Sequence, residues 1–245
     1  MRVAGLFDVH GNLPALEAVL ADLEGEDVDT IVLGGDVASG PMPGETLALL
    51  RSQSVSLRFV RGNADRVLDF AGFPGGDLEL WKRSRLWVAE RLGAADLSFL
   101  AGLPLDVVVD VEGLGSVRFC HGAPGSDELV ITKVTPDERL RRLVESVDER
   151  VVVCGHTHVQ FDRSVDGVRV VNAGSVGAPY EAAPGAYWLL AGPEIDLRRT
   201  GYDVEDAVRR IGATGFPRAG EFAAALPLED PDRPERMSAL IEGNA

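Results

Sequence analysis

The sequence predicts an α/β fold, and three observations carry this prediction. Short apolar runs, many of them rich in β-branched residues, alternate with stretches in which apolar residues recur at helical spacing. Polar residues gather at the carboxyl ends of these runs, which is where open α/β sheets keep their ligand sites. The chain has 245 residues, which is enough for one large domain with a proper core and short for two.

The chain begins with a repeating strand–loop–helix pattern. We expect strands at residues 2–7, 30–33 and 56–60 and helices over 13–23 and 45–51. Asn12 precedes the first helix, and it either caps that helix or contacts a ligand. Helices over 78–92 and 95–100 then interrupt the pattern. The tryptophans in them, Trp81 and Trp87, belong either to a further packed layer or to a cover over the site.

The following stretch is expected to be richer in antiparallel pairs. Strands at 106–111 and 116–120 pair across two glycines, and hairpins are predicted over 160–171 and 186–198, the first turned by an Asp-Gly pair. Thr135 to Glu138 has the sequence of a capping box with proline at the first helical position. Three valines at 151–153 indicate a strand that is buried on both faces.

The C-terminal part of the chain differs in composition. Residues 1–200 are expected to form one domain, and residues 201–245 a helical appendage and tail of that same domain. A short helix from Asp203 to Arg210 has acidic residues in its first turn and arginines in its last. Beyond Leu228 the sequence is rich in Pro, Glu and Asp, so we expect disorder there, or docking on a partner subunit of a homo-oligomer.

Composition and charge limit the partners and the compartment. The formal net charge of −15 argues against general affinity for nucleic acid or acidic membranes, and no apolar run approaches the roughly 20 residues that cross a bilayer. Met1 is followed almost directly by a strand without a leader, which predicts a cytoplasmic protein. Cys120 and Cys154 are too few for a disulfide framework and fit a reducing compartment. Their first expected role is buried packing, with metal ligation second and a redox switch third.

The four histidines of the chain predict a shared metal site. His156 and His158 follow the three valines in the segment V-V-V-C-G-H-T-H, and an isolated H-x-H of this kind is more often a polar turn. His10 and His121, however, also follow apolar strand-like runs, and each is followed by a glycine. Neutral imidazoles at the mouth of an apolar sheet need partners, and a metal ion is a suitable one.

Further oxygen donors lie at the other strand ends, which makes the predicted site dinuclear. Oxygen and nitrogen donors without a thiolate suit two divalent ions, with Mn²⁺ expected first and Fe²⁺, Zn²⁺, Co²⁺ or Ni²⁺ as alternatives. Two such cations about 3.5–4 Å apart repel each other, so an anionic bridge is needed, and Asp36 after two glycines is our choice for it. The expected ligands are Asp8, His10, Asp36, Asn63, His121, His156 and His158.

The order of the motifs resembles a known family. D-x-H-G-N, G-G-D, G-N-x-D, C-H-G and G-H-T-H, followed by N-A-G-S-V-G, resemble the calcineurin-like metallophosphoesterase superfamily and its small prokaryotic phosphodiesterase and phosphatase members. The resemblance implies a four-layer α/β/β/α sandwich with a dinuclear centre between the carboxyl ends of its two sheets. It implies that the first metal is held by Asp8, His10, Asp36 and His158. It implies that the second metal is held by Asp36, Asn63, His121 and His156.

The resemblance also implies a metal-dependent hydrolase of phosphate esters, with a metal-bridging hydroxide as nucleophile. Many family members have a histidine after the asparagine of G-N-x-D that can protonate the leaving oxygen, and this chain has Ala64 there. We therefore expect phosphodiesters, aryl phosphates, nucleotides or dinucleoside polyphosphates to be preferred over alkyl monoesters. Asp65 is expected to act indirectly, by orienting its loop. Substrate contacts are expected from Asn12, Asn63 and Arg66, although a surface ion pair is an equal alternative for Arg66.

Three other functions compete with this prediction. A metal-bearing scaffold that binds a protein partner through the appendage is the main alternative, and the complete ligand set argues against it. A β-lactamase-like hydrolase would need the pattern H-x-H-x-D-H, whereas His158 is followed by Val159, Gln160 and Phe161. A nucleic-acid enzyme of the same superfamily is disfavoured by the net charge, which leaves small-molecule substrates as the prediction.

Overall fold

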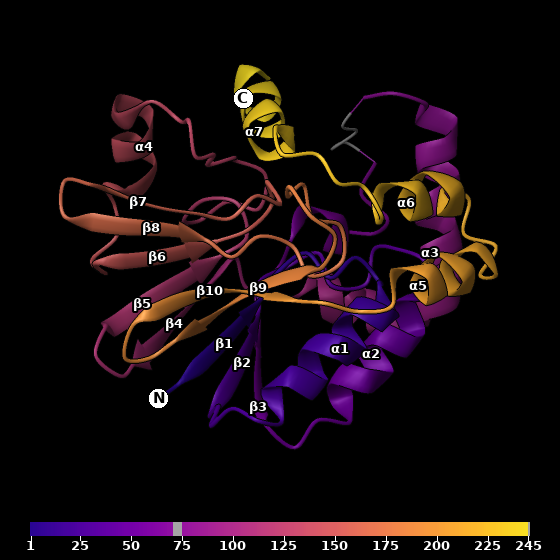
Figure 1. Cartoon of the computed structure of the whole chain (residues 1–245), viewed down its shortest axis with the longest axis horizontal. Coiled ribbons are helices and arrows are strands. Elements are labelled where there is room, and N and C mark those ends of the chain that lie inside the picture. The colour runs from indigo at the N-terminus through magenta and orange to yellow at the C-terminus, as the bar shows by residue number, and fades with distance from the viewer. Residues whose placement is uncertain (71–74, 245) are drawn as a thin grey trace.

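The computed structural model describes residues 1–70 and 75–244. Two five-stranded mixed sheets lie against each other, with helices on their outer faces (Figure 1). This is the four-layer α/β/β/α arrangement that the family resemblance implied. Helices cover the outer face of the first sheet, and the outer layer on the second sheet is a single short helix, α4 (Asp137–Val144).

The first sheet carries the N-terminal strands at its centre and at one edge. Its order is β10-β9-β1-β2-β3, where β1, β2 and β3 run parallel and β9 runs antiparallel to β1. The strands are β1 (Val3–Leu6), β2 (Thr30–Leu33), β3 (Ser56–Phe59), β9 (Ala186–Ala191) and β10 (Ile195–Thr200). Its outer face is covered by α1 (Leu13–Leu23), α2 (Pro43–Arg51) and α3 (Leu78–Ala101).

The second sheet follows the same plan with a parallel centre. Its order is β4-β5-β6-β8-β7, in which β5, β6 and β8 are parallel and the two edge strands are antiparallel to their neighbours. The strands are β4 (Asp106–Val111), β5 (Gly115–Cys120), β6 (Val151–Cys154), β7 (Phe161–Val165) and β8 (Val168–Asn172). Helix α4 (Asp137–Val144) covers its outer face.

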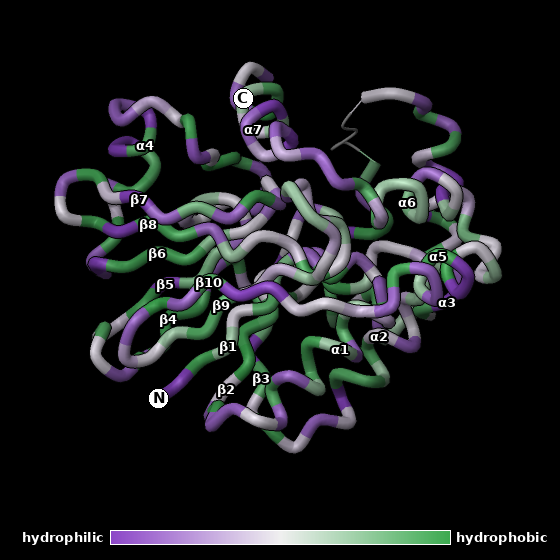
Figure 2. The backbone as a smooth tube through the Cα atoms, viewed as in Figure 1, coloured by the Kyte–Doolittle hydropathy of each residue, from purple (hydrophilic) through white to green (hydrophobic). Residues whose placement is uncertain are grey.

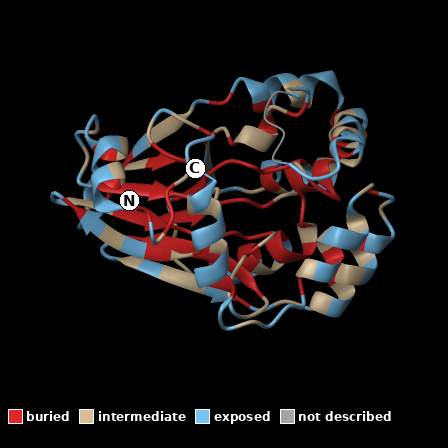
Figure 3. Ribbon diagram, turned by 90° about the horizontal axis from the view of Figure 1, so that it is seen from above, coloured by how far each residue is buried: buried red, intermediate tan, exposed pale blue. Residues whose placement is uncertain are grey.

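The apolar core lies in layers that follow this sandwich. Phe7, directly after β1, and Leu189 of β9 meet Phe119 and Val153 of the second sheet in one buried cluster between the sheets. The central strands β1, β2, β6 and β9 are buried at every position. Figure 3 shows this buried interior in red, with exposed residues on the outer helices and on the outer strands, and Figure 2 shows that polar residues alternate with apolar ones along β10 at the edge of the first sheet. Strand β6 is buried at all four positions, which confirms the prediction that both of its faces are covered.

The predicted helix boundaries are largely confirmed at the N-terminal side. The side chain of Asn12 accepts a hydrogen bond from the Ala15 amide, so Asn12 caps α1. Capping was one of the two roles predicted for it. Helix α3 is interrupted at Gly93, whose φ of 72° is not helical. The two helices predicted on either side of that glycine are therefore present.

The predicted capping box at Thr135 is wrong. Helix α4 begins at Asp137 and has no side-chain cap. The hydroxyl of Thr135 instead accepts a hydrogen bond from the Thr132 amide at 2.8 Å and donates one to Glu242 at 2.5 Å. A tertiary partner from the C-terminal end of the chain has thus replaced the local one, which the sequence around Thr135 does not reveal.

The expected disorder beyond Leu228 is also wrong for the residues that the structure describes. After α5 (Val204–Gly212) and α6 (Ala219–Ala225), helix α7 (Arg233–Gly243) closes the described chain. Its Glu242 bonds to Thr132, Thr135 and Arg139, and its Glu235 pairs with Lys133. The polar residues of this segment therefore dock it on its own chain, between α4 and the loops above the sheets (Figure 1). Within the described residues, no helix is long and apolar enough to cross a membrane.

Candidate metal centre

The loops that follow the strands hold strained backbone conformations. Non-glycine residues rarely have positive φ, and each such residue costs about 1–3 kcal/mol unless its surroundings enforce it. Across residues 1–70 and 75–244, six non-glycine residues have positive φ, and one of them is Asp166 in the predicted hairpin turn. The other five have φ between 48° and 65°, and they are Asp8, His10, Asp36, His156 and His158. Backbone strain is thus concentrated at predicted ligands, where it aims their side chains.

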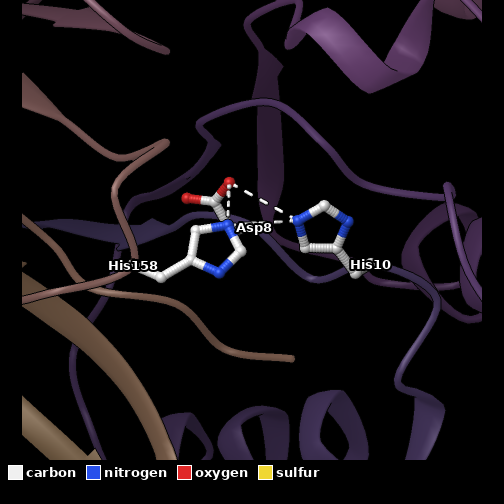
Figure 4. Close-up of side chains that lie close together, drawn as sticks. All are labelled: Asp8, His10 and His158. Carbon is white, nitrogen blue, oxygen red and sulfur yellow. Dashed lines mark hydrogen bonds and ion pairs between the residues drawn. The ribbon is translucent and has the colours of Figure 1, made fainter. Parts of the chain in front are cut away.

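The first ligand group consists of Asp8, His10 and His158, which come from distant parts of the chain (Figure 4). Nε2 of His158 lies 3.2 Å from Oδ1 of Asp8 and 3.2 Å from Nε2 of His10. Nε2 of His10 lies 3.7 Å from the same Asp8 oxygen. Since these three donor atoms converge on one point, the group can hold one cation.

The second group comes from three other loops. Asp36, His121 and His156 each offer a ligand atom, and these atoms lie within 4.8 Å of one another. Oδ1 of Asn63, in the short 3₁₀ turn η1 (Asn63–Asp65), lies 3.2 Å from Nε2 of His121. This group has the donors for a second cation.

Asp36 lies between the two groups. Its Oδ2 is 3.6 Å from Nε2 of His10 and 3.6 Å from Nε2 of His121. Its other oxygen accepts a hydrogen bond from the Ala64 amide at 2.8 Å, which holds the carboxylate in this orientation. Asp36 therefore has the position that a bridging ligand needs.

Hydrogen bonds behind the histidines orient their rings. Nδ1 of His121 donates to the Gly34 carbonyl at 2.9 Å, and Nδ1 of His158 donates to the Ala178 carbonyl at 2.6 Å. Nδ1 of His10 is 3.0 Å from the Ser39 hydroxyl. A carbonyl can only accept, so the lone pair of a neutral His121 or His158 is on Nε2, which faces the other ligands.

Asp65 ties the loops of the site together. Its carboxylate accepts hydrogen bonds from three backbone amides, those of Asp36 and Gly62 at 2.8 Å and that of Val37 at 3.0 Å. Burial and the nearby charge of Asp36 raise the pKa of Asp65 to about 7, and the hydrogen bonds from the Gly62 and Val37 amides offset only part of that rise. The carboxylate is 1 % exposed and does not line the cavities beside the site, so its observed contacts are with backbone.

The electrostatics of the two groups favour bound positive charge. Burial raises the pKa of Asp8, but His158, His121 and His10 together outweigh burial and lower it, so Asp8 is ionised. Its Oδ1 is buried and has no hydrogen-bond partner within the described chain, although an unpaired buried carboxylate oxygen is costly. Burial, with the charge of His121, lowers the pKa of His156 to about 4, which keeps that imidazole neutral and able to bind metal. These residues therefore fit a pair of divalent cations.

Two glycines make room for the carboxylates. A Cβ on Gly62 would lie 2.2 Å from Oδ1 of Asp36, and a Cβ on Gly155 would lie 2.6 Å from Oδ2 of Asp8. Both contacts are shorter than any side chain allows, so only glycine lets the backbone approach these ligands. The amide of His156, the residue after Gly155, donates to Oδ2 of Asp8 at 2.8 Å.

The structure brings together all seven predicted metal ligands, and it gives other surroundings to two predicted substrate contacts. Asn12 is fully buried, and its amide group donates to the Gly177 carbonyl at 2.8 Å. Arg66 forms ion pairs with Asp69, Asp127 and Glu128, which is the alternative that the sequence analysis weighed for it. Contact of Asn12, Asn63 or Arg66 with substrate stays a prediction. Both cysteines are buried in the core beside α4 and are free, as the packing role requires.

Residues that the sequence analysis did not select line the cavities beside the ligands. A cavity of about 420 Å³ reaches His10, Asp36, Asn63 and His156 and is walled by Trp81, Ser84, Arg85 and Val88 of α3. A second, of about 240 Å³, lies between His10, His158 and the C-terminal helices. Both α3 and the appendage thus adjoin the site. Arg85 of α3 and Arg233 of α7 line these cavities and belong to no recognisable motif. The sequence could have indicated them only as basic residues on the buried side of a helix.

Comparison with known proteins identifies the family. The model of the calcineurin-like phosphoesterase superfamily domain matches residues 1–192. An uncharacterized protein of Methanocaldococcus jannaschii is 26% identical over 242 residues, covering 88% of this chain and 93% of its own. A solved metallophosphoesterase from Sphaerobacter thermophilus is 24% identical with a TM-score of 0.72, covering 92% of this chain and 98% of its own. A hypothetical protein from Pyrococcus horikoshii is 20% identical with a TM-score of 0.79, covering 94% and 99%. The chain belongs to the calcineurin-like phosphoesterase superfamily.

Proposed function

We propose that this protein is a dinuclear-metal phosphoesterase that hydrolyses phosphodiesters or activated phosphate esters of small molecules. The observation that carries the proposal is the position of Asp36, whose Oδ2 lies 3.6 Å from a histidine of each ligand group. A carboxylate shared in this way suits two cations close together, and two-metal sites are typical of phosphate ester hydrolysis.

The two cations would be held by the two ligand groups, with Mn²⁺ as our first choice for a mixed set of imidazole and carboxylate donors. When bound, such a pair lowers the pKa of water to produce a nucleophile and neutralises charge on the phosphate oxygens. The protein's own residues prepare the site for this chemistry. The carbonyls of Gly34 and Ala178 hold Nδ1 of His121 and His158, and Asp65 holds the loops that carry Asp36 and Asn63.

Arg85 is the residue we assign to the phosphoryl group of the substrate. Its guanidinium donates to the backbone carbonyls of Val67 and Arg66 and packs over Trp81, with its carbon 4.9 Å from the ring centre. It forms no ion pair with any residue that the structure describes, and it lines the same cavity as Asp36. Neutral carbonyls orient the guanidinium without cancelling its charge, so it remains available to an anion.

Ala64 supports a preference among leaving groups. It lines the cavity at the place where the family pattern has histidine, and a methyl group cannot donate a proton. Esters with a good leaving group depend least on a general acid. We therefore propose phosphodiesters, aryl phosphates or nucleotide polyphosphates as substrates.

The surroundings of the site support a small substrate. Residues of the segment after α5 line both cavities, and α3 walls the larger one, so we propose that residues 201–245 are part of the catalytic domain and help to enclose the substrate. The net charge of −15 opposes nucleic acid as the substrate. The two free, buried cysteines are consistent with our placement of the protein in the cytoplasm.

The experiment that tests the proposal is the hydrolysis of bis(p-nitrophenyl) phosphate by protein stripped with a chelator, with and without added Mn²⁺. The proposal expects turnover that depends on the metal. If the metal binds and a broad panel of phosphate monoesters and diesters remains intact, the enzyme proposal fails and the scaffold alternative takes its place.

A further inference from the structure

The cavity of about 240 Å³ beside the first ligand group is lined by an arginine that forms no ion pair with any residue that the structure describes. Arg233, the first residue of α7, lines this cavity and is 8 % exposed. Among the residues that the structure describes, its side chain has no hydrogen bond and no ion pair. Its one aromatic contact is with Tyr180, whose ring centre lies 5.4 Å from the guanidinium carbon.

The acids around Arg233 are engaged elsewhere. Glu221 pairs with Arg218 at 2.8 Å, and Asp230 pairs with Arg236 at 2.6 Å. Glu181 accepts a hydrogen bond from the Gln160 amide at 2.6 Å. The guanidinium of Arg233 lines the cavity without a carboxylate in ion-pair contact, so an anion that enters the cavity would supply the partner that it lacks.

The cavity also offers an apolar surface of aromatic size. Tyr180 stacks on the imidazole of His158 with ring centres 5.0 Å apart and planes inclined by 23°. Phe216, Phe222 and Leu226 form the opposite lining from the segment that follows α5. Apolar cavities of roughly 150 Å³ already bind benzene, so this one has room for an aromatic ring with a charged substituent.

The cavity adjoins the proposed reaction site directly. His10, Ser39, His158 and Tyr180 line both this cavity and the one that reaches Asp36. A phosphate ester whose phosphorus lies at the ligand groups can therefore extend its organic part along Tyr180 toward α7. The end of that organic part would lie beside Arg233.

We propose that this cavity is a leaving-group subsite for aromatic phosphate esters that carry a second anionic group, and that Arg233 binds that second anion. The anion is a carboxylate or a phosphoryl group, since a guanidinium binds either in the same forked manner. Arg233 is then a specificity-determining residue that acts at a distance from the reacting bond. The inference rests on the proposed function for the nature of its ligand, and its test does not require turnover.

The test measures binding of three phosphonates that cannot be hydrolysed, by calorimetry on the Mn²⁺-loaded protein. Phenylphosphonate lacks the second anion, whereas 4-phosphonobenzoate adds a carboxylate and 1,4-benzenediphosphonate adds a phosphoryl group. We expect at least one of the latter two to bind about tenfold or more tightly than phenylphosphonate, as a charge-assisted hydrogen bond would produce. The tighter of the two identifies the anion.

Variants of Arg233 decide whether that residue is responsible. Arg233→Met should bring the dianionic ligands to within about threefold of phenylphosphonate, whose own affinity should change little. Arg233→Gln is the second variant if the methionine protein fails to fold, and Arg233→Lys should restore part of the preference. Arg142→Met is the control, because Arg142 lies on α4 with 62% of its side chain exposed, lines neither cavity and should leave every affinity unchanged.

The outcomes separate this inference from the proposed function. Equal affinities of the three ligands in the natural protein, or a preference that survives Arg233→Met and Arg233→Gln, would overturn the subsite. A preference that survives both substitutions of Arg233 would mean that the added anion contacts the metals. If no phosphate ester is hydrolysed while the preference depends on Arg233, the enzyme proposal fails and the binding subsite stands.

Discussion

Nε2 of His10 lies 3.2 Å from Nε2 of His158, although the two residues are 148 positions apart in the chain. Nδ1 of His158 is committed to the Ala178 carbonyl, and Nδ1 of His10 contacts the Ser39 hydroxyl. When these Nδ1 atoms carry the hydrogens, the two lone pairs face each other beside the buried Oδ1 of Asp8. Such an arrangement is unfavourable alone, and a cation held by Asp8, His10 and His158 would stabilise it.

The three amide hydrogen bonds to Asp65 predict a large effect of a small substitution. Asp65→Asn keeps one acceptor oxygen and turns an NH₂ group toward backbone amides that are themselves donors. We expect the free energy of unfolding to fall by about 3 kcal/mol, because buried donors would lose their acceptor. Urea denaturation measures this change. Asp148→Asn, at an exposed position, is the control and should have no resolved effect; an equal loss in both variants would contradict the assigned role.

Glu242 predicts a pH-dependent contribution of α7 to stability. Burial raises the pKa of Glu242, but hydrogen bonds from Thr135, Arg139 and Thr132 outweigh it and lower the pKa below its usual 4.5. A depressed carboxyl pKa stabilises the fold fully above the unfolded pKa, and that contribution is lost as pH falls through the folded pKa. Glu242→Gln should therefore destabilise the protein by about 1 kcal/mol at pH 7 and by less at pH values below 4.5.

Thermal unfolding of the natural protein and Glu242→Gln across this pH range measures the difference. Glu235→Gln is the matched control on the same helix, because its side chain is 63% exposed where it pairs with Lys133. Because that pair is exposed to solvent, its loss should change stability less than the loss of Glu242. A Glu242 effect that stays constant down to acid pH would mean that its charge is not what docks α7.

The charge of Arg85 is expected to increase the rate of phosphate ester hydrolysis. Its substitution by methionine keeps the packing on Trp81 and removes the charge, so kcat/KM for bis(p-nitrophenyl) phosphate should fall by about 10². Steady-state kinetics on metal-loaded protein measures this. Arg83→Met, at an exposed position of the same helix, should leave kcat/KM unchanged. Equal kinetics of the two variants would remove Arg85 from the site.

Ala64 predicts the range of leaving groups. Hydrolysis of bis(p-nitrophenyl) phosphate should exceed that of a simple alkyl phosphate by about 10² or more in kcat/KM, because no general acid replaces the histidine of the family pattern. Ala64→His should raise the alkyl rate selectively, and Ala64→Gln controls for added bulk. Comparable turnover of the two esters by the natural protein would show that another group already protonates the leaving oxygen.

The convergence of the seven predicted ligands could be anticipated from the sequence because each of them follows a strand. The carboxyl ends of parallel strands meet at one edge of a sheet, so Asp8, His10 and Asp36 had to lie near one another once β1 and β2 were parallel. His121 and His156 follow β5 and β6 in the same way. The family resemblance supplied the pairing of the two sheets, which the local patterns do not contain.

The residues that the sequence analysis missed depend on tertiary contacts. Arg85 and Arg233 lie on helices whose orientation toward the site is set by packing, and their neighbours in sequence carry no motif. Thr135 matched a local capping pattern, but Glu242, 107 positions away, bonds to it instead. The same contact explains why the polar C-terminal segment is ordered: its acidic residues have partners in the fold that composition alone cannot reveal.

The central claim is a site that needs both of its cations, and a stoichiometric titration tests it most directly. Chelator-stripped protein would be titrated with Mn²⁺ while bound metal and hydrolysis of bis(p-nitrophenyl) phosphate are followed together, with Asp36→Asn as the variant that lacks the bridging carboxylate. We predict that hydrolysis reaches its plateau only when two equivalents have bound, one for each ligand group, and that Asp36→Asn does not reach it. Full activity at one equivalent, or two bound equivalents without hydrolysis, would contradict the account.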